Sequence, residues 1–92
     1  MVTAIVLINV HRGHVNDVAQ ELVSLDGITE VFSVAGRYDL VAILRTRDNE
    51  RIAGLVTREI MAIANIAHTE TLLAFQVFSD YDLARMFSIG LD

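Results

Sequence analysis

The chain has 92 residues, of which 53% are apolar, and seven arginines, no lysine and twelve acidic residues give it a formal net charge of −5. This acidic balance argues against direct binding to nucleic acid, because such binding needs basic side chains to neutralise phosphates. The absence of cysteine excludes disulfides, thiolate nucleophiles and cysteine metal ligands.

The high apolar fraction also predicts an oligomer. A domain this small cannot hide so much apolar surface in its own core, and contiguous apolar patches usually mark association. No uninterrupted apolar stretch approaches the roughly 18 residues of a membrane helix, and the start of the chain lacks the charges of a signal peptide. We therefore expect a cytoplasmic protein without a membrane partner.

The first half of the chain predicts a strand, a helix and a second strand. Residues 3–11 are dense in Ile and Val, as in a strand at the centre of a sheet. Residues 14–25 place apolar side chains at helical spacing, and Gly27 follows as a helix-ending glycine. Residues 28–35 return to the β-branched and aromatic types of a strand.

The second half predicts the same order of elements. Residues 40–47 form a strand that is apolar on both faces, and a helix over 48–63 begins at an Asp or Asn cap. Residues 66–78 predict a long fourth strand. Residues 79–92 predict a short helical extension outside the domain formed by residues 1–78.

An internal repeat points to the fold. A shift of 38 positions places Val18 on Val56 and Leu22 on Ile60. Two βαβ halves with right-handed crossovers predict an α+β, ferredoxin-like βαββαβ sandwich, with the first and third strands central and both helices on one face. The other face stays bare, which predicts a face-to-face dimer.

The reversal between the second and third strands is a candidate site. It carries Gly36, which can take a positive φ or let a ligand approach the backbone, followed by Arg37, Tyr38 and Asp39. A cation, a phenol and a carboxylate thus lie side by side on a loop held by two strands. This composition suits a small zwitterionic ligand.

Two stretches, VFSVAGRYDLVAIL and IAHTETLLAF, resemble the effector-binding domain of the Lrp/AsnC family of transcriptional regulators. This domain is also called the regulation-of-amino-acid-metabolism (RAM) domain. The most specific matches are Gly36-x-Tyr38-Asp39 in the reversal and Thr69-x-Thr71 at the last strand. The helices match only by pattern.

The resemblance implies a non-catalytic regulator that binds an amino acid without a cofactor. It implies dimers built through the sheets, assembly into tetramers or octamers, and ligand bound between dimers. Family members carry a DNA-binding helix-turn-helix ahead of this domain, whereas this chain begins at Met1 directly in the first strand. We therefore expect a stand-alone form to which DNA recognition is not carried over, with a full-length family member as a further possible partner.

The resemblance also implies a site shared between subunits. Asp39 would take the ligand's ammonium, backbone near Gly36 or Arg37 its carboxylate, and Leu72 or Leu73 its side chain. The predicted ligand-binding residues are Gly36, Arg37, Tyr38 and Asp39 of one subunit with Thr71, Leu72, Leu73 and Ala74 of another.

Other interpretations of these residues stay open. Asp39 also suits a turn carboxylate that binds local backbone, Arg37 a solvated charge, and Tyr38 a ring packed on a neighbour. His11 and His14 straddle a strand-to-helix turn without a carboxylate partner, so no metal site is expected.

Two other classes of function also stay open. The first is a cofactor-free monooxygenase-like enzyme, which needs an enclosed pocket with a positioned His, Asn or Trp, and the chain has no Trp. The second is a ligand-free assembly module that mixes with full-length regulators.

Overall fold

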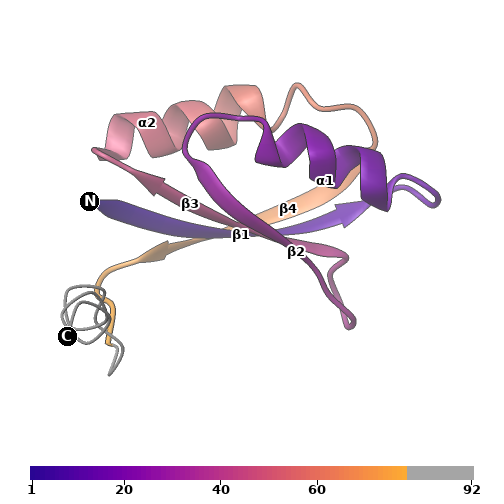
Figure 1. Cartoon of the computed structure of the whole chain (residues 1–92), viewed down its shortest axis with the longest axis horizontal. Coiled ribbons are helices and arrows are strands. Elements are labelled where there is room, and N and C mark those ends of the chain that lie inside the picture. The colour runs from indigo at the N-terminus through magenta and orange to yellow at the C-terminus, as the bar shows by residue number, and fades with distance from the viewer. Residues whose placement is uncertain (79–92) are drawn as a thin grey trace, which may run out of the picture.

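In the computed structural model, which describes residues 1–78, four strands form one sheet and the helices lie together on one side of it (Figure 1). Each element begins within one residue of its predicted start, whereas the second helix and the fourth strand end differently. In chain order the elements are β1 (Val2–Val10), α1 (Val15–Val23), β2 (Ile28–Ser33), β3 (Leu40–Thr46), α2 (Asn49–Gly54), the π-helical turn η1 (Leu55–Glu59) and β4 (Ile66–Ala74).

The strand order β2-β3-β1-β4 confirms the ferredoxin-like topology. All three pairs of neighbouring strands are antiparallel, and the most apolar strands, β1 and β3, are central. Each helix connects a central strand to an edge strand, as in a split βαβ unit. The two predicted halves are therefore interleaved in one sheet.

The core lies between the sheet and the helices. Side chains alternate between the two faces of a strand, so every second residue of β1 and β3 points toward the helices. These inward side chains meet the buried faces of α1, α2 and η1. The fully buried side chains of this layer include Ala4, Val6, Ile8, Leu22, Leu40, Ala42, Leu44 and Leu55.

The opposite face of the sheet carries no helix among the described residues (Figure 1). Its centre is apolar and only partly covered, with Phe32 and Leu72 each 47% exposed, and the charged residues Glu30 and Glu70 lie on the edge strands of the same face. The strand register brings the apolar side chains of this face side by side, since Ile5 pairs with Ile43 on one side and with Leu72 on the other. We call the set Ile5, Leu7, Phe32, Val41, Ile43 and Leu72 the open face.

The second helix differs from its prediction. It begins as expected, with Asp48 as the N-cap whose carboxylate accepts the Arg51 N–H at 2.9 Å. It does not continue as an α-helix to residue 63, because the Ile60 N–H bonds to the Leu55 carbonyl five residues back, at 2.8 Å. One residue is thereby inserted into the turn.

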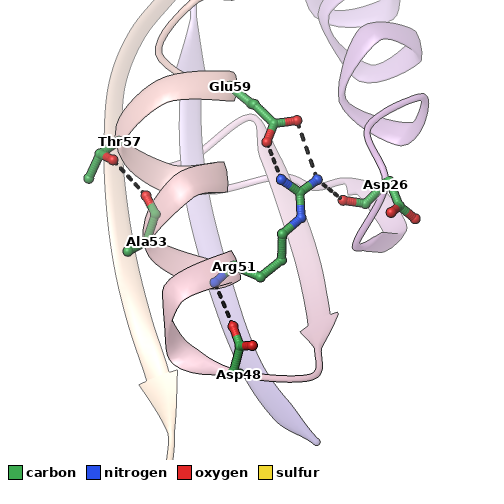
Figure 2. A network of polar contacts seen from close by, with 6 residues as sticks. All are labelled: Asp26, Asp48, Arg51, Ala53, Thr57 and Glu59. Atoms are coloured by element: carbon green, nitrogen blue, oxygen red, sulfur yellow. Dashed lines mark hydrogen bonds and ion pairs between the residues drawn. The ribbon is translucent and has the colours of Figure 1, made fainter.

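The inserted residue brings an ion pair into line (Figure 2). In a regular α-helix, residues eight apart lie about 80° apart around the axis. The wide turn reduces this offset, and Arg51 pairs with Glu59 while also donating to the Asp26 carbonyl at 2.6 Å. The hydrogen bond with Glu59 raises the pKa of the Arg51 guanidinium above its ordinary value. Arg51 therefore fastens α2 and η1 to the loop before β2.

The prediction that the fourth strand extends to Phe78 is wrong beyond Ala74, where β4 ends. The reason is the length of its partner. Ala74 pairs with Thr3, and β1 begins at Val2, so the ladder of backbone hydrogen bonds runs out there. The predicted helix within residues 79–92 lies outside the described residues.

We expect Gly27→Ala to lower the free energy of unfolding by about 1–3 kcal/mol. Gly27 has φ +106°, and a Cβ there would lie 2.8 Å from Cδ1 of the buried Leu55. Urea denaturation measures the loss. Gly13→Ala is the control, because Gly13 has φ +87° but nothing within 4 Å of the added Cβ. Equal losses for the two variants would contradict the packing argument.

Candidate ligand-binding site

The hairpin between β2 and β3 forms an exposed corner at one end of the sheet (Figure 1). The Val34 N–H donates to the Asp39 carbonyl at 3.0 Å and closes the loop. Gly36 has φ +133°, and nothing lies within 4 Å of the position of a Cβ there. The positive φ expected for this glycine is confirmed, and the backbone beside it is open to an approaching ligand.

Asp39 ties this corner to the central strand. Its N–H donates to the Ile8 carbonyl at 2.9 Å, and its carboxylate oxygen Oδ2 accepts the Val10 N–H at 2.9 Å. Asn9 adds a third link, because its side-chain amide donates to the Arg37 carbonyl at 2.7 Å. The Asp39 carboxylate thus binds backbone, as one interpretation of the residue expects, but the backbone belongs to β1 and is not local.

Tyr38 links the hairpin to the far edge of the sheet. Its hydroxyl donates to Oε2 of Glu70 on β4 at 2.8 Å. This hydrogen bond is the main cause that raises the pKa of Tyr38 above its ordinary value, and the nearby charge of Arg37 acts in the opposite direction. Arg37, Tyr38 and Glu70 therefore lie close together at this corner.

The other half of the predicted site does not meet the hairpin within one chain. Thr71 and Ala74 pair with Val6 and Thr3, whereas the hairpin is anchored at Ile8. At about 3.4 Å per residue, Thr71 and Ala74 lie about 7 and 17 Å along the sheet from the level of Ile8. The last residues of β4 accordingly lie toward the end of the sheet opposite the hairpin (Figure 1).

Leu72 and Leu73, the two leucines predicted to contact the side chain of the ligand, point in different directions. Leu72 pairs with Ile5 on the open face, and Leu73 pairs with Ala4, which points toward the helices. Both leucines are 47% exposed. Since they point to opposite faces of the sheet, only one of them can line a given pocket.

Asn9 and Glu70 belong to this corner but are missing from the predicted site residues. A signal for each is present in the sequence. Asn9 is the one amide in the apolar run TAIVLINV, and Glu70 is the charged residue between Thr69 and Thr71. Neither signal identifies the hydrogen-bond partner. Arg37 lies 28 residues from Asn9, and Tyr38 lies 32 residues from Glu70.

A cavity of about 420 Å³ opens at the opposite end of the sheet. Arg51 in its lining is bonded to Glu59 and to the Asp26 carbonyl, and Asp48 to the Arg51 N–H, as Figure 2 shows. Arg45 likewise pairs with Glu30 at 3.2 Å. The lining consists of Met1, Asp26, Gly27, Arg45, Thr46, Arg47, Asp48 and Arg51.

Of the histidines, His68 lies beside the corner, because it pairs with Asn9 on β1. His14 Nδ1 is 3.2 Å from the Asp17 carboxylate, and this contact lowers the pKa of Asp17. Over residues 1–78, no three histidine or acidic side chains gather as a metal site would require. No helix in the same residues is long and apolar enough to cross a membrane.

A family model and curated sequences match the chain. The model described as "Lrp/AsnC ligand binding domain" matches residues 3–83. The HTH-type transcriptional regulator FL11 of Pyrococcus furiosus is 29% identical over 79 residues, which cover 86% of this chain and 52% of that protein. The chain thus spans about half the length of the curated relatives it matches.

Solved structures share the fold. TTHA0845 from Thermus thermophilus is 39% identical, with a TM-score of 0.81 over 86% of this chain and 99% of that one. E. coli AsnC is 23% identical, with a TM-score of 0.80 over 89% and 56% of the two chains. A more distant structure, NMB0573 from Neisseria meningitidis in complex with L-Met, is 9% identical, with a TM-score of 0.71 over 92% and 58%.

We expect Asp39→Ala to lower the free energy of unfolding by about 1–2 kcal/mol, because it leaves the Val10 N–H without its acceptor. Hydrogen exchange of the Val10 amide should become faster, and NMR measures it residue by residue. Asp39→Asn keeps an acceptor oxygen and should retain most of the protection. An unchanged exchange rate in Asp39→Ala would show that the carboxylate does not anchor the hairpin.

Proposed function

Because this chain belongs to the Lrp/AsnC ligand-binding domain family, we propose that it binds a free amino acid or a closely related metabolite without transforming it. The curated relatives are transcriptional regulators, which supports a regulatory role. In this proposal the ligand acts by changing how copies of the domain assemble, since a ligand that binds one assembly state better shifts the equilibrium toward it.

The observation that carries the proposal is the fixed hairpin corner. Hydrogen bonds from Asn9 and Asp39 hold the tip in one position, and Gly36 leaves its backbone open. A loop fixed before the ligand arrives loses little entropy on binding. Charges of both signs stand at this corner, on Arg37 and Glu70, and they match the two charges of an amino acid.

The proposed site needs a second copy of the chain. Thr71 to Ala74 lie about 7 to 17 Å along the sheet from the residue that anchors the hairpin, so in this proposal the hairpin meets the corresponding segment of another copy. The open face supports pairing of copies, because a contiguous partly exposed apolar surface is typical of an interface. We propose a dimer through the open face and a further association of dimers that brings a hairpin to the Thr71–Ala74 segment of another copy.

Isothermal titration against the twenty amino acids tests ligand binding. The L-Met complex of the Neisseria protein shows only a shared fold, but it makes L-Met a reasonable first probe. We expect saturable heat with at least one amino acid, and Gly36→Leu should weaken that binding at least about tenfold by blocking the backbone.

Gly13→Leu is the matched control for this titration. Gly13 also has a positive φ and open space around it, but it lies outside the hairpin corner. Binding should survive this substitution. Absence of heat with all twenty amino acids for the unaltered chain would refute the proposed function and favour the ligand-free assembly module.

Static light scattering tests the dimer. We expect the chain to be a dimer or larger, and Leu72→Glu to shift it toward the monomer, because a charge on the open face must be desolvated in the interface. Val23→Glu is the control, since Val23 is 52% exposed on α1, away from that face. A monomeric unaltered chain would contradict the interface.

A further inference from the structure

The hydrogen bonds at the hairpin corner distinguish its two carboxylates. Asp39 is half-buried, and its Oδ2 accepts the backbone N–H of Val10 at 2.9 Å. An ammonium bound at this carboxylate would have to share it with the Val10 N–H that anchors the hairpin. A residue that holds the tip in place is therefore poorly suited to be the main acceptor for an ammonium group.

Glu70 differs from Asp39 in exposure and in its hydrogen-bond partner. It is exposed, it lies on β4 opposite Leu7, and the only hydrogen bond of its side chain within the described residues is the one from the Tyr38 hydroxyl, at 2.8 Å. A phenol leaves the carboxylate its full negative charge, unlike an arginine partner. The contact also restricts the rotamer of Glu70, which lowers the entropy that a ligand must overcome.

Arg37 supplies a positive charge at the same corner. Arg37 directly precedes Tyr38 in the hairpin, and its carbonyl is held by the Asn9 side-chain amide at 2.7 Å. Within residues 1–78, Arg37 and Glu70 do not form an ion pair with each other, whereas Arg45 with Glu30 and Arg51 with Glu59 do. The hairpin thus carries a positive side chain at Arg37, next to the tyrosine whose hydroxyl bonds to Glu70.

We propose that Glu70 binds the ammonium of the ligand and Arg37 its carboxylate, while Asp39 acts only as a positioning residue. The inference rests on the proposed function and deepens it. It names the recognised group as the zwitterionic head of an α-amino acid, and it adds Glu70 to the site. Tyr38 holds Glu70 toward the hairpin and is a second positioning residue.

The experiment uses the amino acid that binds the full chain most tightly in the titration, together with its des-amino acid and its carboxamide. The first analogue lacks the ammonium and the second lacks the carboxylate charge. Glu70→Gln should weaken binding of the amino acid at least about tenfold, and it should bind the des-amino acid with the affinity of the unaltered chain. Arg37→Gln should likewise weaken binding of the amino acid, and it should bind the carboxamide with the affinity of the unaltered chain.

Glu30→Gln is the matched control. Glu30 is also an exposed glutamate on the same face of the sheet with an identified partner, but it lies on β2, the opposite edge strand from β4. Its substitution should leave all three affinities unchanged. Tyr38→Phe should weaken the amino acid by only a few-fold, because the carboxylate remains while its orientation is lost.

The possible results separate this inference from the proposed function. If an amino acid binds but Glu70→Gln has the affinity of the unaltered chain, the inference is overturned and the proposed function stands. Loss of ammonium recognition in Asp39→Asn, with Glu70→Gln unaffected, overturns it in favour of Asp39. If the unaltered chain binds no amino acid, both fail. Thermal melting of each variant distinguishes loss of binding from loss of fold.

Discussion

The geometry of the candidate site depends on the bonds that hold the hairpin tip against β1. Without them residues 34–39 would be an exposed connection between β2 and β3, with no fixed position for its side chains. The backbone bond of Asp39 to Ile8, its carboxylate bond to Val10, and the bond from Asn9 to Arg37 fix the loop at three points. The tip is therefore a rigid part of the sheet, and the charges beside it have defined places.

The fold was predictable because it depends on local pattern. Strands apolar on both faces belong in the centre of a sheet, and β1 and β3 are there. The helical spacing that includes Val18 and Leu22 marks the side of α1 that is buried. Two helices on one face then follow from the topology, and so does an apolar face left without a helix.

The rest depends on partners that no local pattern identifies. The π-turn at η1 has no signal in the helical spacing, and the ion pair that it allows between Arg51 and Glu59 joins residues that a regular helix would offset. The end of β4 at Ala74 is set by where β1 begins. The hairpin residues were found as a group, but the place of Glu70 beside Tyr38 joins residues 32 apart, and only the register of the sheet brings them together.

The strand order has a consequence for the position of the predicted site. If β1 is exchanged with β3 and β2 with β4, the strand order β2-β3-β1-β4 becomes the same order counted from the other edge of the sheet. An approximate two-fold axis therefore runs between the two central strands. The 38-residue shift obeys this pseudosymmetry, placing Ala4 on Ala42, and both are fully buried. The same shift places Gly36 on Ala74, so the hairpin corner and the end of β4 are symmetry equivalents at opposite ends of one sheet. An approximate two-fold axis keeps such equivalents apart within a protomer, and in this chain the charged residues Arg37 and Asp39 have the uncharged Phe75 and Val77 as their equivalents.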